Sequence, residues 1–187
     1  SGLKGLYPTD TNGKTMYVDV SQVEELHCMA VEGTTLEVGA ATTIETLGTI
    51  MALDKRGCHA RFTPVISKLQ ALSIDENLSR IAQQVYNIAG VHVRNRATLG
   101  GNMALAKLKP EHFPSDLAGQ FLALGASIKL VNITSGAKSS KGLAEWLQAA
   151  WDPSELIEAL SIPLPTEKIY LNQRAVLRSQ NCHAYLS

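Results

Sequence analysis

The chain has 187 residues, a formal net charge of zero and 45% hydrophobic residues. That composition is sufficient for one sizeable core, or for two small lobes that share an interface. Because 17 Lys and Arg residues are balanced by 17 Asp and Glu residues, there is no overall field to attract nucleic acid or an anionic membrane. No apolar stretch approaches the roughly 18–20 residues of a spanning helix. We therefore expect a protein that binds neither nucleic acid nor a membrane.

The cysteines and histidines show no pattern typical of a metal site. Cys28, Cys58 and Cys182 are far apart and no Cys-x-x-Cys is present, so neither a zinc ribbon nor an iron–sulfur cluster is expected here. Unpatterned cysteines favour a reducing compartment, which predicts the cytoplasm. The five histidines lack metal-ligand spacing, and no Ser-His-Asp order or paired carboxylates stand out. We expect no catalytic side chain and no metal, as when a cofactor performs the chemistry.

In the N-terminal part of the chain, residues 16–20 and 36–40 predict two short strands. A helix is expected to begin after Thr43 and to end near Gly57, because apolar residues recur there at helical spacing. These residues are Ile44, Leu47, Ile50 and Met51. The polar segment 55–64 is predicted to be a loop.

The middle of the chain predicts two further helices. Pro64 is expected to open the first, because proline is favoured at the first helical position. Ser73 and Glu76, three residues apart, form a capping-box signature for the second, and Gly90 is expected to end it. This second helix carries the strongest amphipathic stripe of the chain. The stripe comprises Leu78, Ile81, Ala82, Val85 and Ile88.

The C-terminal half predicts a mixture of elements. We expect a helix over 115–124, a strand over 127–132, a polar turn over 136–141, a short helix around Trp146 and a strand over 155–162. Strands and helices follow one another without the steady alternation of a doubly wound sheet. The pattern therefore predicts an α+β fold with two lobes that meet along a cleft.

The segment 93–102 is the most unusual stretch of the sequence, Val-Arg-Asn-Arg-Ala-Thr-Leu-Gly-Gly-Asn. Gly100 and Gly101 would let the backbone approach a ligand closely, with free N–H groups for phosphate. Thr98 and Asn102 would add side-chain hydrogen bonds. The alternative interpretation is an ordinary tight turn. The segment is neither a Rossmann fingerprint nor a Walker loop.

A second candidate segment, 112–117, reads His-Phe-Pro-Ser-Asp-Leu. Ser115 or Asp116 would cap the N-terminus of a helix. The same geometry would also let the carboxylate of Asp116 accept hydrogen bonds from ligand hydroxyls. The residues alone leave both interpretations open.

These segments resemble the FAD-binding domain of the molybdenum hydroxylases, the family of aldehyde oxidases and xanthine dehydrogenases. Residues 93–102 are similar to the family pattern Arg-Asn-x-(Ala/Gly)-(Ser/Thr)-(Leu/Ile)-Gly-Gly-Asn, and residues 112–116 are closest to plant-type aldehyde oxidases. Residues 19–26 resemble the family's "DISxIPEL" element, and residues 36–43 its "xIGAxxT" strand. The similarity runs nearly end to end and in the right order. Its last matching positions are Arg174, Arg178, Asn181 and Ala184.

The resemblance implies that the chain binds FAD with its central segments. The backbone around Thr98, Gly100, Gly101 and Asn102 would line the phosphates and the ribityl chain. Asp116 would accept hydrogen bonds from FAD hydroxyls.

The resemblance also implies contacts at the two ends of the cofactor. Ala89 and Gly90 would lie beside the adenine, while Ala104 and Ile157 would approach the isoalloxazine ring. Arg174 occupies a position where relatives carry Lys or Arg near the flavin. Ile88 stands where some relatives place an aromatic residue against the adenine, which argues against stacking there.

Compared with the family, the chain is expected to be incomplete at both ends. Its opening residues match only the end of a "VVGNT-x-x-G" loop whose amides hold the pyrophosphate. The resemblance divides the chain into an incomplete N-terminal FAD-binding lobe (1–57), a second FAD-binding lobe (58–170) and the start of a C-terminal lobe (171–187). We expect such a fragment to fold but to retain FAD poorly or not at all.

The implied function is electron transfer within a larger oxidoreductase. The FAD would pass electrons from iron–sulfur clusters to oxygen or NAD, and the isolated chain would not be active alone. The molybdenum cofactor and the [2Fe–2S] clusters would reside in other domains of the parent enzyme, expected to be a homodimer. One alternative is the flavoprotein subunit of a bacterial carbon monoxide or nicotinate-type hydroxylase. The other is a non-catalytic scaffold or interaction domain that has lost FAD.

Overall fold

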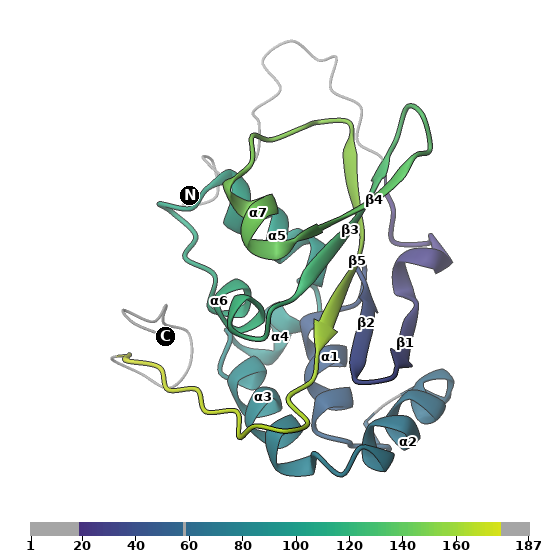
Figure 1. Cartoon of the computed structure of the whole chain (residues 1–187), viewed down its shortest axis with the longest axis vertical. Coiled ribbons are helices and arrows are strands. Elements are labelled where there is room, and N and C mark those ends of the chain that lie inside the picture. The colour runs from purple at the N-terminus through teal and green to yellow at the C-terminus, as the bar shows by residue number, and fades with distance from the viewer. Residues whose placement is uncertain (1–18, 58, 177–187) are drawn as a thin grey trace.

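The strands of the chain form one antiparallel sheet. The computed structural model describes residues 19–57 and 59–176, and its sheet has five strands in the order β1-β2-β5-β3-β4 (Figure 1). All of its pairings are antiparallel. The strands are β1 (Met29–Glu32), β2 (Thr35–Gly39), β3 (Ser127–Asn132), β4 (Lys138–Gly142) and β5 (Glu155–Pro163). The α+β class predicted from the sequence is confirmed.

Helices precede the first of these strands and lie between the others along the chain. A 3-10 helix η1 (Glu24–His27) precedes β1, and most of the helices lie to the left of the strands in Figure 1, with α2 below β1. The remaining elements are α1 (Ile44–Met51), η2 (Ala60–Phe62), α2 (Thr63–Ala71), α3 (Asp75–Tyr86), α4 (Val91–Arg94), α5 (Leu99–Leu108), α6 (Asp116–Ala123) and α7 (Leu143–Gln148). Within the described ranges, none of these helices has the length and apolarity needed to cross a membrane.

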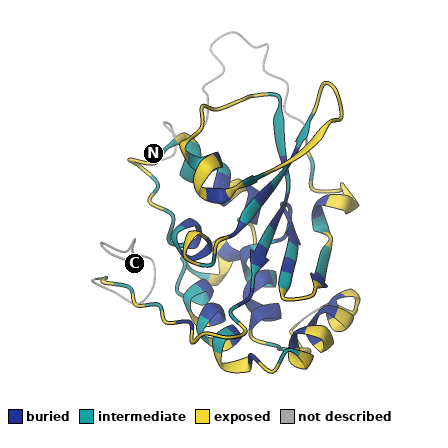
Figure 2. Cartoon of the chain, in the orientation of Figure 1, coloured by how far each residue is buried: buried dark blue, intermediate teal, exposed yellow. Residues whose placement is uncertain are grey.

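The two faces of the sheet differ in character. In β2, Leu36 and Val38 are fully buried while Glu37 between them points to the other face, where Lys129 of β3 pairs with it at 2.5 Å. Such alternation is typical of an antiparallel sheet with one face on the core and one face in water. The core side continues through Ile128 and Leu160, also fully buried. Figure 2 shows buried segments in the central strands and an exposed turn between β3 and β4.

The amphipathic helix predicted in the middle of the chain is α3. Leu78, Ile81, Ala82 and Val85 are buried as predicted, and burying each large side chain contributes about 1.5–3 kcal/mol relative to exposure. Ile88 lies beyond the last residue of α3 and is only partly buried against the core.

Helix α3 begins at Asp75, two residues after Ser73, but the predicted capping box and the predicted end near Gly90 were wrong. Ser73 has a positive φ of 55°, and the residue before the helix is Ile74, so no capping box forms. The helix ends at Tyr86, four residues before Gly90. It ends there because the buried Arg94 donates hydrogen bonds to the carbonyls of Tyr86 and Ala89. Gly90 instead precedes the short helix α4.

The predictions for short strands had a mixed outcome. Residues 127–132 and the strand near 155–162 are confirmed as β3 and β5. The polar turn predicted over 136–141 was wrong, because most of it forms β4, an edge strand whose exposed faces need no apolar residues. Strand β1 was not predicted, and the strand predicted over 16–20 lies mostly outside the described residues.

The predicted ranges 1–57 and 58–170 both contribute strands to the sheet. Strand β2 belongs to the range 1–57 and pairs with β5 of the range 58–170. The described parts of both ranges therefore contribute to one sheet and one hydrophobic core. The boundary near residue 57 and the third range, 171–187, remain predictions about subdivision.

Candidate functional site

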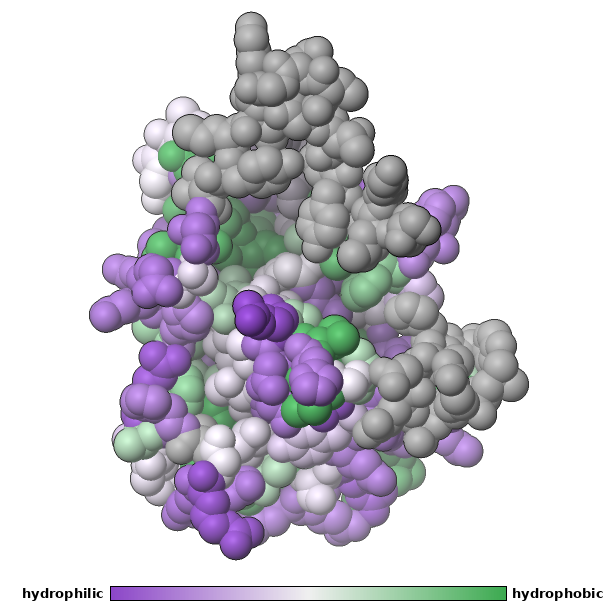
Figure 3. All heavy atoms as spheres, turned by 180° about the vertical axis from the view of Figure 1, so that it is seen from behind, coloured by the Kyte–Doolittle hydropathy of each residue, from purple (hydrophilic) through white to green (hydrophobic). Residues whose placement is uncertain are grey.

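A cavity of about 660 Å³ opens where the start of α5 meets the segment after β2 and the start of β5. Small residues, among them Ala40, Ala41, Gly101 and Ala104, line part of it, so a ligand can approach the backbone closely. The volume lies within the range of about 300–1,000 Å³ typical of small-molecule sites. Seen from behind, the molecule has a hollow in its upper half where apolar residues gather (Figure 3). The remaining lining residues are Asp19, Val20, Ser21, Leu26, His27, Thr43, Asn95, Arg96, Thr98, Gly100, Trp151, Glu155, Leu156 and Ile157.

Backbone hydrogen bonds join the two segments at the base of this cavity. The amide of Gly100 donates to the Ala40 carbonyl at 2.8 Å, and the amide of Leu99 donates to the Thr42 carbonyl at 2.9 Å. A Cβ atom on Gly100 would lie 2.8 Å from the Cβ of Ala40. Glycine is therefore required at position 100 by packing between α5 and the segment after β2.

Two helices begin side by side at the cavity. Thr43 and Thr98 form an antiparallel bridge and are the N-caps of α1 and α5. The hydroxyl of Thr43 accepts from the amide of Thr46, and that of Thr98 accepts from the amide of Gly101, both at 3.1 Å. The positive ends of both helix dipoles therefore lie at the cavity, an arrangement that favours an anion.

The amides at the start of α5 differ from what the sequence predicted. The Gly-Gly pair was expected to form a turn with free N–H groups, but both glycines lie in the first turn of α5. The amides of Leu99, Gly100 and Gly101 all donate to groups inside the protein. The prediction of free phosphate-binding amides at these residues was therefore wrong. The helix dipole remains available there, but direct donation from these N–H groups does not.

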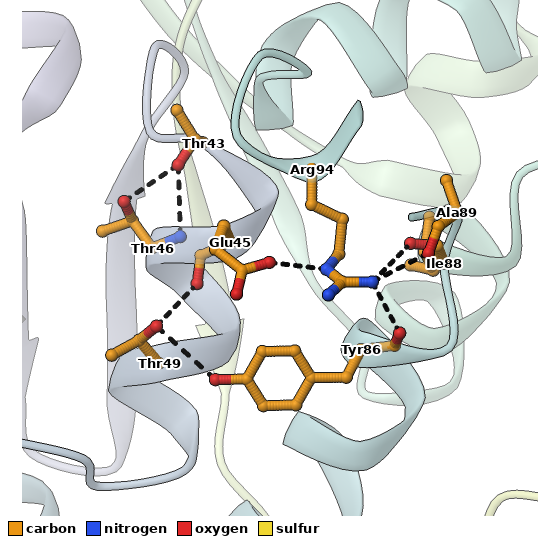
Figure 4. Close-up of polar contacts among 8 residues, drawn as sticks. All are labelled: Thr43, Glu45, Thr46, Thr49, Tyr86, Ile88, Ala89 and Arg94. Carbon is orange, nitrogen blue, oxygen red and sulfur yellow. Dashed lines mark hydrogen bonds and ion pairs between the residues drawn. The ribbon is translucent and has the colours of Figure 1, made fainter. Parts of the chain in front are cut away.

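Arg94, at the other end of the same segment, is buried and holds the end of α3 (Figure 4). Its Nε donates to Glu45 of α1 at 2.6 Å, and its Nη1 donates to the carbonyls of Tyr86 at 2.7 Å, Ala89 at 2.8 Å and Ile88 at 3.2 Å. A cation near the carbonyls at a helix C-terminus is stabilising. We refer to Arg94, Glu45 and these three carbonyls as the Arg94 cluster.

The Arg94 cluster explains where two predicted adenine contacts lie. The carbonyl of Ala89 accepts from Arg94, and Ala89 has a positive φ of 49°. The carbonyl of Gly90 accepts from the amides of Val93 and Arg94. Both residues thus shape the connection between α3 and α4, and neither lines the cavity.

Asn102 and Asp116 lie on α5 and α6, which Ser115 connects. The Ser115 hydroxyl is 2.6 Å from Oδ1 of the buried Asn102 and also caps α6 by accepting from Ala118. Asp116 pairs with Arg174 at 2.5 Å, and the two side chains are 15% and 5% exposed, respectively. This pair lines a second, much smaller cavity that also includes Gln84, Ile88, Gln120 and Asn172.

The structure thus distributes the predicted FAD contacts over three places. Thr98, Gly100, Gly101, Ala104 and Ile157 line the cavity. Asn102 lies behind it, and Asp116 and Arg174 pair with each other. Ala89 and Gly90 belong to the surroundings of Arg94. The roles of all ten residues toward FAD remain predictions.

Several lining residues were not predicted from the sequence. Arg96 is exposed at the cavity although Arg94, two residues earlier, is buried. Trp151 also lines the cavity, and an aromatic residue in a polar loop was the signal that could have indicated it. Asp19 contributes a carboxylate whose pKa is lowered by hydrogen bonds from Ser21. Across residues 19–57 and 59–176, no group of three or more His, Cys, Asp or Glu side chains is placed to hold a metal ion.

Comparison with known proteins identifies the family. Residues 6–165 match the family described as the FAD binding domain in molybdopterin dehydrogenase. The chain belongs to this FAD-binding family. FAD is therefore the cofactor of the domain. The small-residue lining, the two helix N-termini and the cationic Arg96 of the cavity fit a ligand with a planar ring and a pyrophosphate.

The chain is similar to plant aldehyde oxidases. It is 34% identical over 120 residues to an indole-3-acetaldehyde oxidase of Arabidopsis thaliana, an alignment covering 62% of the chain and 9% of that relative. It is 30% identical over 148 residues to probable aldehyde oxidase 1 of Oryza sativa subsp. japonica, covering 79% of the chain and 9% of that relative. The chain thus spans about a tenth of the length of these relatives.

Solved structures show the same fold. The quinoline 2-oxidoreductase of Pseudomonas putida 86 matches with a TM-score of 0.53 and 22% identity, covering 79% of this chain and 43% of that one. A Cu,Mo-containing CO dehydrogenase matches with a TM-score of 0.52 and 23% identity, covering 75% and 41%. The predicted membership of the molybdenum hydroxylase family is confirmed.

Proposed function

We propose that the cavity at the start of α5 is the FAD site of this domain. The observation that carries the proposal is the gathering of Thr98, Gly100, Gly101, Ala104 and Ile157 around one cavity. The resemblance assigns all of them to the flavin, yet Ile157 comes from β5, far from the others in sequence. Their meeting in space is what a shared ligand requires.

The cavity offers the cofactor two kinds of surface, one apolar and one with positive potential. Ala104 and Ile157 provide an apolar surface for the isoalloxazine ring. The N-termini of α1 and α5, with Arg96 nearby, provide positive potential for the pyrophosphate. Because the first amides of α5 donate internally, the dipoles and Arg96 act there without direct amide donation.

We further propose that the domain belongs to a molybdenum-containing, aldehyde oxidase-like oxidoreductase of the cytoplasm. Bound FAD would supply the redox chemistry, taking electrons from iron–sulfur clusters and delivering them to oxygen or NAD. The chain's own residues bind the flavin, orient it and exclude water from its ring. Iron–sulfur and molybdenum domains would be its partners, within a parent homodimer. Similarity to plant aldehyde oxidases supports this assignment.

Titration of the purified chain with FAD tests the site. Ala104→Leu places a larger side chain in the cavity with little loss of helix propensity, and it should weaken FAD binding at least tenfold. Gly101→Val should do the same, because a side chain there meets the Thr98 hydroxyl and enters the cavity. Ala123→Leu is the matched control, since Ala123 is exposed on α6 and does not line the cavity. Equal FAD affinity in Ala104→Leu and Ala123→Leu would contradict the proposed site.

A scaffold that no longer binds FAD is the rival function. Two features favour it: the amides of Leu99, Gly100 and Gly101 are engaged internally, and Asp116 pairs with Arg174. Saturable binding in the titration excludes the scaffold, which would show no change in flavin absorbance at any FAD concentration. Saturable binding that Ala104→Leu weakens supports the FAD site.

A further inference from the structure

Trp151 presents an exposed aromatic surface to the cavity. The sequence contains two tryptophans, and they differ in environment. Trp146 is 2% exposed and packs under the ammonium group of Lys107, 4.6 Å from its ring centre. Trp151 is 42% exposed and lines the same cavity as Leu156 and Ile157. Exposed indole beside other apolar groups is available for contact with a ligand.

The loop that carries Trp151 is held by hydrogen bonds on both sides. Before it, Lys107 of α5 donates to the carbonyl of Ala149 at 2.7 Å and also to that of Trp146. After it, Asp152 accepts from the amide of Ser154 at 2.8 Å and from its hydroxyl at 2.7 Å. These two bonds also lower the pKa of Asp152. The indole is therefore presented by an ordered loop, which reduces the entropy lost when a ligand binds.

The cavity's charges indicate which part of a ligand Trp151 meets. Arg96 and the N-termini of α1 and α5 favour the anionic pyrophosphate. Trp151 precedes β5 in sequence, and Leu156 and Ile157 of β5 supply further apolar lining, while the neighbouring carboxylate of Glu155 is paired with Lys141 at 2.7 Å. A planar, uncharged ring is the chemistry that suits this part, and aromatic rings stack in offset or edge-to-face arrangements.

We infer that Trp151 is a positioning residue that packs against the isoalloxazine ring of the bound flavin. This inference rests on the proposed FAD site and adds a contact supplied by the loop between α7 and β5. The indole covers the ring and restricts water there. The adenine end of the cofactor makes no contact with it.

Binding of three ligands tests the inference: FAD, riboflavin, which has the ring without the adenine, and AMP, which has the adenine without the ring. Trp151→Ala should weaken FAD and riboflavin binding by the same factor, about three- to tenfold for one aromatic contact. AMP binding should be unchanged. Trp151→Phe should recover part of the affinity, because a planar ring is restored. Ile169→Ala is the control, since Ile169 is 73% exposed and outside the cavity.

The outcomes distinguish this inference from the proposed function. Unchanged riboflavin affinity in Trp151→Ala overturns the inference while leaving the FAD site intact. Weaker AMP binding with unchanged riboflavin binding also overturns it, because the indole would then contact adenine. Riboflavin affinity that neither Ala104→Leu nor Trp151→Ala lowers would overturn the proposed FAD site and the inference with it. Melting temperatures of all variants show whether any loss of affinity arises from unfolding.

Discussion

The Arg94 cluster and the cavity lie at the two ends of one short segment, yet they are built in opposite ways. In the Arg94 cluster, a buried guanidinium donates to a carboxylate and three carbonyls, so the polar groups satisfy one another. In the cavity, the start of α5 presents small residues to open space, with Arg96 exposed at its edge. One region is closed by polar contacts, and the other is kept open by the absence of side-chain bulk.

The comparison shows that one family motif contains residues that hold the fold together and residues that line the cavity. Arg94 and Gly100 hold helices in place, because one joins α1 to the end of α3 and the other lets α5 pack on Ala40. Arg96, Gly101 and their cavity neighbours remain available to a ligand. Matching a motif therefore does not make each of its residues a ligand contact. Substitutions at adjacent positions can separate the two roles.

Arg94→Ala should have the largest effect on folding. It leaves Glu45 partly buried without its ion pair and three carbonyls without their donor, which should cost about 3 kcal/mol. Urea denaturation measures this loss as a lower midpoint with an unchanged slope. Arg96→Ala is the matched control, with a change in stability within about 0.5 kcal/mol. Similar losses in both variants would remove the distinction between the two arginines.

Gly100→Ala should have the next largest effect. The added Cβ would lie 2.8 Å from the Ala40 Cβ and 3.1 Å from its carbonyl oxygen, and such overpacking costs about 1–3 kcal/mol. Gly101→Ala meets only the Thr98 hydroxyl, at 3.0 Å, and its helix-propensity gain of up to about 1 kcal/mol offsets part of that strain. In thermal unfolding, the melting temperature of Gly100→Ala should therefore be lower than that of Gly101→Ala. The opposite ranking would show that Ala40 can move aside.

Thr98→Ala should lower stability by about 1 kcal/mol, the usual cost of losing an N-cap. Its hydroxyl accepts from the Gly101 amide, and that amide would then face the cavity without its partner. Thr98→Ser keeps the hydroxyl and should retain most of the stability. The measurement is the melting temperature of both variants without ligand. Equal losses in Ala and Ser variants would attribute the effect to the methyl group.

Arg96→Ala should leave the fold intact and weaken FAD binding by a few-fold. The reason is electrostatic, because an exposed guanidinium attracts the pyrophosphate across solvent. In FAD titrations at low and high salt, the difference in FAD affinity between the original chain and the variant should decrease as the salt concentration increases. A difference that persists at high salt would indicate a direct, desolvated contact instead. This outcome would sharpen the assignment of Arg96.

Much of the local structure could be predicted from the sequence. The buried face of α3, the cap at Ser115 and the strand at 127–132 follow from periodicity and capping chemistry, which act over a few residues. Predictions failed where distant groups decide. Helix α3 ends at Tyr86 because Arg94 donates to the carbonyl of Tyr86, and β4 forms because β3 pairs with its polar residues.

The candidate site could be predicted only in part, for the same reason. The segment 93–102 indicated a flavin site through its residue types and its resemblance to a family. The sequence could not show that the amides of Leu99 and Gly100 are used by Thr42 and Ala40, because those partners lie more than fifty positions away along the chain. Nor could it show that Asp116 meets Arg174.

The sequence by itself determined the α+β class, most of the helices and strands, and the segments that carry the flavin family's motif, because each depends on short-range patterns. Only the tertiary structure decided which motif residues line the cavity and which hold the fold together. Arg94 and Arg96 have the same side chain two positions apart, and nothing local distinguishes them. The folded chain places Glu45 and the end of α3 around the first and open space around the second. The two arginines therefore differ in role because the folded chain gives them different burial and different hydrogen-bond partners.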